Sequence, residues 1–208
     1  MPRIVPSDTE KFRMYKLIEN KITVHCGFRK RQLVSTEIAT NTINHTWRIG
    51  VNSSAEKPRH VLVAFQKSDV DGKQDKNPSV FDHANMKQIH VLLNDVRYPS
   101  RDKIVDFSNH HYIEHYKSFS HFARDFYGID TLLVPNSIGP IEYKDTYPIF
   151  HIDVSKQSER ITSGVVDIQI KFTFAESVQT TSLRAYALII SDSLIDFASD
   201  GSKMNIVR

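Results

Sequence analysis

Residues 147 to 190 read YPIFHIDVSKQSERITSGVVDIQIKFTFAESVQTTSLRAYALII, and this stretch decides the fold. Every second residue from Val166 to Phe174 is apolar, and the residues between them are polar. This two-residue period is typical of an antiparallel strand with one buried face, because successive side chains leave opposite faces of a strand. Ser163-Gly164 supplies a turn before it. The stretch as a whole predicts three strands, at 149–154, 165–174 and 183–190.

The same period predicts strands outside this stretch, at 22–28, 32–38, 43–51, 60–66, 89–93 and 194–197. Residues 60–66 are apolar on both faces at their centre, so we expect a strand that is covered on both sides or lies at an interface.

Two segments have helical signals instead. Ser7 to Glu10 has the spacing of a capping box and predicts a short helix at 8–19. Aromatic residues three and four apart predict a second helix at 110–127, and Gly128 fits its C-cap.

Together these segments predict a mainly all-β protein: an antiparallel eight-stranded jelly-roll sandwich with one or two inserted or flanking helices. We expect an N-terminal arm with a short helix at residues 1–20 and a single jelly-roll domain at 21–198. The helix at 110–127 is inserted in that domain, and residues 199–208 form a polar, frayed tail.

Composition excludes several classes of protein. The chain has 208 residues, a formal net charge of +3 and one cysteine, so it has no internal disulfide and no strongly basic nucleic-acid domain. Cys26 falls in an apolar strand pattern, where we expect a small buried side chain. No apolar run is long enough to span a membrane. We therefore interpret the glycosylation patterns at Asn44 and Asn52 as chance matches and expect the protein to be made in the cytosol.

The best pattern for a metal site is HHYIEH, residues 110 to 115. On a helix, His111 and His115 share a face, as zinc ligands require, but the glutamate of HExxH and a third ligand are missing. We therefore predict a polar helix face and no metal, with His111 and His115 as the only candidate ligands. No nucleophile elbow or phosphate-binding loop occurs either, so we predict no enzyme and no cofactor.

Arg29, Lys30 and Arg31 form the densest basic run of the chain. Adjacent cations repel one another, so they belong on a solvated turn or opposite an anion. These three residues are the first candidates for contact with phosphate groups.

Five blocks of sequence, in this order, carry a family resemblance: EKPRHVLVAFQ (56–66), FDHANMKQIHVLLNDVRYP (81–99), YIEHYKSF (112–119), IFHIDVSKQSERITSGVVDIQIKF (149–172) and AYALIISDSLIDF (185–197). The chain resembles the C-terminal jelly-roll half of the double jelly-roll major capsid proteins of Polinton (Maverick) elements and their adintovirus-like relatives. The resemblance covers most of the chain from about residue 8 onward, and none of the blocks is catalytic.

The resemblance implies a structural domain that self-associates into capsomers, as a homotrimer or with a pseudo-hexameric outline. It implies other capsid proteins as partners, non-specific contact with packaged double-stranded DNA, and a place in a virion capsid assembled in the host cytoplasm or nucleus. Because the family subunit has two jelly rolls in tandem and this sequence has about half that length, the chain resembles an excised domain, a fragment or a co-opted copy of a transposable element's gene.

Two alternatives stay open at this point. A co-opted jelly roll can serve as a binding module for glycan, protein or nucleic acid, and a concave aromatic-lined pocket would favour that reading. A cupin-like metalloenzyme on the same fold would need two or three histidines that converge inside the barrel.

Overall fold

The computed structural model describes residues 4–50, 57–70, 73–128, 138–157, 166–178 and 183–207. The chain divides into two compact units. One combines residues 1–30 with 192–208, and the other is residues 31–191.

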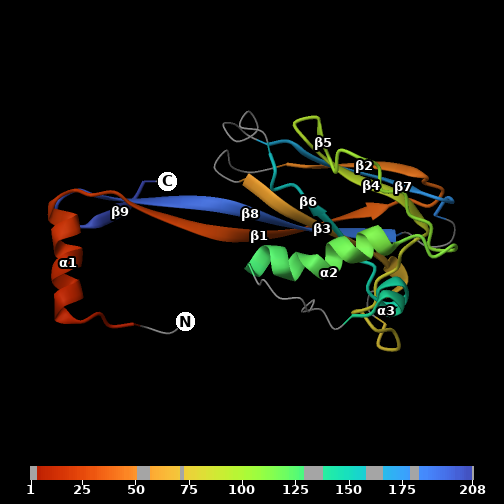
Figure 1. Ribbon diagram of the computed structural model, residues 1–208, viewed down its shortest axis with the longest axis horizontal. Helices are drawn as coiled ribbons and strands as arrows, with labels where there is room; N and C mark the ends of the chain where they lie inside the picture. Colours follow the sequence, from red (N-terminus) through yellow and green to blue (C-terminus); the bar gives the residue numbers. More distant parts are fainter. Residues whose placement is uncertain are drawn as a thin grey trace. The chain divides into compact units, whose positions relative to one another are not determined.

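Nine strands form two sheets in the described residues (Figure 1). The five-stranded sheet has the order β1 (Val24–Ile38), β8 (Leu183–Ser199), β3 (Lys57–Lys67) and β6 (Phe150–Asp153), and β9 (Met204–Ile206) pairs with the end of β8. The four-stranded sheet has the order β2 (Asn44–Ile49), β7 (Ile168–Phe174), β4 (Met86–Leu93) and β5 (Val96–Tyr98). The prediction of a mainly β, antiparallel jelly-roll sandwich is confirmed.

The core lies between these sheets, and β7 shows why the sequence forms it. Its register places Phe172 opposite His45 of β2 and Ile89 of β4, so one apolar face runs across three antiparallel strands. The apolar residues of β7 are buried, and the polar ones between them are half-buried. Phe65 of β3 meets Phe172 edge to face at 5.2 Å between ring centroids. Such aromatic contacts add to the burial of apolar area that stabilises the sandwich.

Four helical segments accompany the sheets: α1 (Asp8–Glu19), the 3₁₀ turn η1 (Ser68–Val70), α2 (Ile113–Tyr127) and α3 (Pro140–Asp145). Helix α1 has the predicted bounds, although the side chain of Ser7 makes no capping hydrogen bond. Gly128 ends α2 in the left-handed conformation, as predicted. Helix α2 begins at Ile113, three residues after the predicted start, because His110 has a positive φ of 59° and cannot continue a right-handed helix.

Three differences from the predicted strands share one cause. The strands predicted at 22–28 and 32–38 are one strand, β1, and those at 183–190 and 194–197 are one strand, β8. Residues 204–206, predicted as part of a frayed tail, form β9 against the end of β8. Ladder hydrogen bonds with a neighbouring strand hold polar residues in extended conformation, and a single sequence does not show that neighbour.

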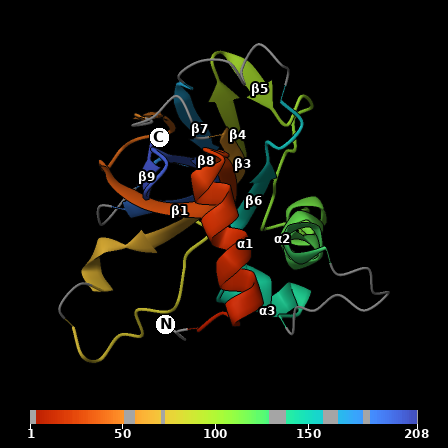
Figure 2. The same cartoon turned by 90° about the vertical axis from the view of Figure 1, so that its left-hand side faces the viewer.

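Strand β3 is buried on both faces along most of its length, as one of the two predicted alternatives requires. One face lies in the core, and helix α2 covers the other. Helix α2 runs beside β6 in both views of the molecule (Figures 1 and 2). No helix of the described residues combines the length and apolar character needed to cross a membrane.

Candidate functional site

A cleft beside α2 gathers titratable side chains, and residues of β6, the neighbour of β3 in the sheet, line it. In their antiparallel register His60 lies opposite Asp153, and Leu62 lies opposite His151. These four residues therefore share the outer face of the sheet, whereas Val61 and its apolar neighbours point into the core.

Helix α2 covers this face with aromatic side chains. The ring of His60 packs edge to face against Phe122 at 5.4 Å and against Phe126 at 6.0 Å between centroids. Phe122 also lies 4.8 Å from the ring of His151. Both histidines are consequently less than a tenth exposed.

The two histidines form a hydrogen-bonded chain that ends on the backbone of α2. Nδ1 of His151 lies 2.9 Å from the carbonyl oxygen of Ser118, and Nε2 of His151 lies 3.1 Å from Nδ1 of His60. A carbonyl oxygen only accepts, so His151 carries its proton on Nδ1, and its Nε2 accepts from the Nδ1–H of His60. The chain thus fixes a neutral tautomer of His151.

The other end of the cleft is built around Lys103. Its ammonium group donates to the hydroxyl of Ser118 at 2.8 Å, and that hydroxyl donates to the carbonyl oxygen of Glu114 at 3.0 Å. The buried ring of His115 lies above, with Nε2 at 3.5 Å from the carbonyl oxygen of Lys103 and Nδ1 without a hydrogen-bond partner. His115 also packs edge to face on Phe150.

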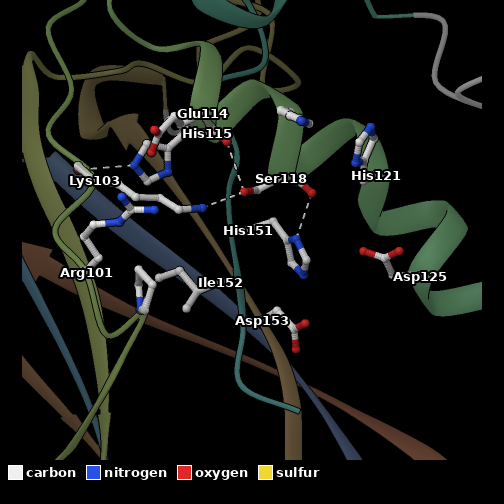
Figure 3. A pocket seen from close by; sticks show the side chains of 12 residues that line it. Arg101, Lys103, Glu114, His115, Ser118, His121, Asp125, His151, Ile152 and Asp153 are labelled. Carbon is white, nitrogen blue, oxygen red and sulfur yellow. Dashed lines mark hydrogen bonds between the residues drawn. The ribbon is translucent and has the colours of Figure 1, made fainter. Parts of the chain in front are cut away.

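The cleft has a volume of about 470 Å³. In Figure 3 Arg101, Lys103, Glu114 and His115 lie at one end, and His121 and Asp125 lie at the other, with His151 and Asp153 between them. The cations and carboxylates are equal in number among the side chains that line it: Arg101, Lys103 and Lys117, and Glu114, Asp125 and Asp153. The lining has no net formal charge, so it does not select an anion or a cation by charge alone.

Burial shifts the titration of the buried histidines. It lowers the pKa of His151 to about 4, against a smaller opposing effect of the hydrogen bond to Ser118. It also lowers the pKa of His115 to about 4, and the charge of Lys103 adds to that effect. The pKa of Lys103 is itself lowered by burial. His151 and His115 are therefore neutral at neutral pH, and each binds a proton as the pH falls towards 4.

The structure separates the two histidines that the sequence pattern put on one helix face. His111 precedes α2, is exposed and pairs with Asp106 through two backbone hydrogen bonds, whereas His115 lies buried in the first turn of α2. No group of three or more histidine, cysteine or acidic side chains in the described parts of the chain is placed to hold a metal ion.

The basic run lies within strand β1 and not on a turn. Arg29 faces Asp192 at 3.9 Å, and the guanidinium carbon of Arg31 lies 5.7 Å from the centre of the Phe126 ring. Alternation along the strand sends Lys30 to the face opposite that of its two neighbours. Cys26, expected to be buried, is exposed, as are the other residues at the start of β1.

Sequence reasoning missed the His60–His151 pair. The two residues are 91 positions apart, and only the β3–β6 register brings them together. The one available signal was a histidine next to apolar residues in each of two strand patterns, in HVLVAF (60–65) and FHID (150–153), where a polar residue needs a partner once it is buried.

Comparison with known proteins identifies the family. No curated protein matches the chain. Among solved structures it is similar to the capsid of the virus PBCV-1 (10% identity, TM-score 0.42) and to PBCV-1 VP54 fitted into a reconstruction of the virophage Sputnik (9% identity, TM-score 0.38). Each comparison covers 97% of this chain and 54% of the other, so the chain spans about half the length of the structures it matches. The family described as the double jelly roll-like domain matches residues 1–195, and the chain belongs to that family.

Proposed function

We propose that this chain is a structural, non-enzymatic domain of a viral-type major capsid protein and that it works by self-association into capsomers. The family match over residues 1–195 supports the capsid-type role. An amphipathic two-stranded ribbon in the unit of residues 1–30 and 192–208 supports self-association, and it is the observation on which the proposal depends.

Two ion pairs define the register of this ribbon. His25 bonds to Asp196 at 2.7 Å, and Arg29 faces Asp192 at 3.9 Å. The partners are four residues apart on each strand and run in opposite directions, as in an antiparallel pair of β1 and β8. Both ion pairs lie on one face of the ribbon, because residues directly opposite each other share a face.

The other face of the ribbon is apolar. The same register places Val24 opposite Phe197 and Cys26 opposite Ile195, with Phe28 next along β1. Val24 is 37% exposed and Phe28 is 41% exposed. A two-stranded ribbon is marginally stable in water, and a contiguous exposed apolar face marks an interaction site. A second copy of the chain, burying this face, is the occupant that a capsid role requires.

Size-exclusion chromatography with light scattering over a range of protein concentrations tests self-association. We expect concentration-dependent oligomers that Phe28→Ser weakens by tenfold or more. Leu194→Ser is the matched control, because Leu194 has a similar exposure of 39% and lies on the charged face. A strict monomer at high concentration, or equal weakening by both variants, would count against the proposal.

The finer identity is also a proposal: one jelly roll of a Polinton/Maverick (adintovirus-like) capsid protein of a double-stranded DNA virus or transposable element. It would assemble as a homotrimer or pseudo-hexamer with other capsid proteins in a virion made in the host cytoplasm or nucleus. The five ordered sequence blocks support it. A second jelly roll encoded in frame next to this one, and trimers in electron micrographs, are the expected findings.

Contact with packaged DNA is proposed for Arg29, Lys30 and Arg31. Residues 1–30 and 192–208 carry nine basic and six acidic side chains, so the chain's entire formal net charge of +3 belongs to this unit. Phosphate binding of this kind has no sequence preference and weakens steeply with salt. Binding to duplex DNA that is insensitive to salt, or unchanged by Arg29→Ser with Lys30→Ser, would argue against it.

The binding-module alternative gains no support from the cleft. That reading called for an aromatic-lined pocket, and the cleft beside α2 is lined mainly by charged and histidine side chains.

A further inference from the structure

The contact between α2 and the five-stranded sheet contains a hydrogen bond between two buried histidines, and this bond depends on their protonation. Nε2 of His151 accepts from Nδ1–H of His60 at 3.1 Å. It can do so only while His151 is neutral, because the other nitrogen, Nδ1, keeps its proton for the carbonyl oxygen of Ser118. A proton added to Nε2 turns this acceptor into a donor, so the contact then lasts only if His60 moves its own proton from Nδ1 to Nε2. A second proton leaves two N–H groups facing each other.

The surroundings of the pair decide what happens next. The ring of His60 packs against Phe122 and Phe126 of α2, and the ring of His151 packs against Phe122, so both rings are largely shielded from water while α2 is docked. The lowered pKa of His151 means that its charge is less stable in this buried place than in water, so acidification favours an open form in which the rings reach solvent. The Ser118 carbonyl of α2 accepts a hydrogen bond from His151, so a change in the pair acts directly on this helix.

Charged side chains face the pair from every element packed around it. Asp153 of β6 lies 4.0 Å from His60, and Asp125 of α2 favours the protonated form of His151. The cleft also holds His115, His121, Glu114 and Lys117 of α2, and Arg101 and Lys103 before it. The carboxylates of Asp153 and Asp125 favour the binding of a first proton to the pair. A second proton is disfavoured, because the two positive rings would then repel each other at contact distance.

We propose that protonation of the His60–His151 pair is an acid trigger that detaches helix α2 from the outer face of the five-stranded sheet while the sandwich stays folded. Detachment uncovers the aromatic side of α2 and the sheet face beneath it, and so turns an internal contact into exposed apolar surface. This function does not depend on self-association.

The sign of the effect follows from the neutral state of His151 in the folded protein. An exposed histidine takes up its proton near pH 6.5, whereas docking of α2 holds the pKa of His151 at about 4. The detached form therefore binds more protons between these values, and docking weakens as pH falls from about 6.5 towards 4. Above pH 7 the pair stays neutral, so it adds no pH dependence to the docking of α2.

Two probes separate detachment from unfolding. Ser120 lies buried on α2, and in a Cys26→Ser background Ser120→Cys places the only thiol of the chain at a buried position of this helix. Its reaction with 4,4′-dithiodipyridine, normalised to a free thiol at each pH, measures how often α2 opens. Trp47, the only tryptophan, is buried in the sandwich and reports unfolding of the sheets by its fluorescence.

We expect the normalised labelling rate to rise at least tenfold between pH 7.5 and 4.5 while Trp47 fluorescence stays native. The comparison is made in a His115→Phe background, because His115 is a further buried histidine of α2 whose pKa is lowered by burial. There His151→Asn keeps a donor for the Ser118 carbonyl but does not titrate, so the rise should fall to twofold or less. His60→Asn is the second variant, with the same expectation. His110→Asn is the control, because His110 is exposed in a left-handed conformation that asparagine tolerates. A rise that survives in both pair variants, or that appears only together with the Trp47 change, overturns the proposal.

Discussion

At the scale of single residues, the two-residue spacing of apolar side chains predicted which residues form the core, and Phe172 is an example. The strand pattern placed Phe172 on the buried face of β7, and it is 2% exposed between Phe65, Phe174 and His45. What the pattern could not supply is the partner of each polar residue, because partners such as His60 and His151 lie on strands far apart in sequence.

Truncation of Phe172 to alanine should cost about 3–5 kcal/mol in the free energy of unfolding, because it leaves a cavity among three aromatic rings. Phe12→Ala should cost less than about 0.5 kcal/mol, since Phe12 is 70% exposed on α1. Denaturant unfolding followed by Trp47 fluorescence measures both. Similar costs at the two positions would contradict the assignment of the core.

His115 provides a second residue-scale prediction, which concerns global stability. Its pKa is lowered to about 4 by burial, so the unfolded chain binds an extra proton between about pH 6.5 and 4, and stability falls across that window. The loss from this residue approaches about 3 kcal/mol, at about 1.4 kcal/mol per pKa unit. His115→Phe removes the unpaired Nδ1, keeps the contact with Phe150, and should flatten this part of the pH dependence measured by urea unfolding. A stability profile identical to that of the unchanged protein would show that the site does not titrate as described.

At the scale of elements, the sequence predicted which segments are strands better than it predicted where they end. Strand β1 continues through Arg29, Lys30 and Arg31. The sequence of three cations alone suggested a turn, and only the pairing of β1 with β8 shows that they lie in a strand. Helix α2 shows the converse case. Its aromatic spacing was plain, yet its role as the cover of β3 and β6 depends on tertiary contacts that local periodicity does not encode.

The C-cap of α2 yields a prediction about this element alone. Gly128 has φ of 65°, and a Cβ added there would meet no atom within 4 Å, so Gly128→Ala carries only the cost of the left-handed conformation. We expect about 1 kcal/mol of destabilisation in thermal unfolding monitored by circular dichroism. Gly27→Ala is the control, because Gly27 of β1 has no positive φ and equally open space. Equal effects of the two substitutions would mean that backbone conformation is not the cause.

At the scale of the whole molecule, one of the two units holds the buried core and the other holds the surface proposed for self-association. The sandwich of residues 31–191 holds the buried core and Trp47, whereas α1 in the other unit buries none of its residues. A twelve-residue helix without buried residues is not stable by itself in water, so the stability of α1 depends on a surface that covers it. The buried core of the sandwich contains no residue of α1. Removal of residues 1–20 should therefore leave the unfolding transition of Trp47 within about 1 kcal/mol of the full chain and weaken oligomers in light scattering. Loss of the Trp47 transition on removal would place α1 in the folding core, and unchanged oligomers would confine association to the ribbon of β1 and β8.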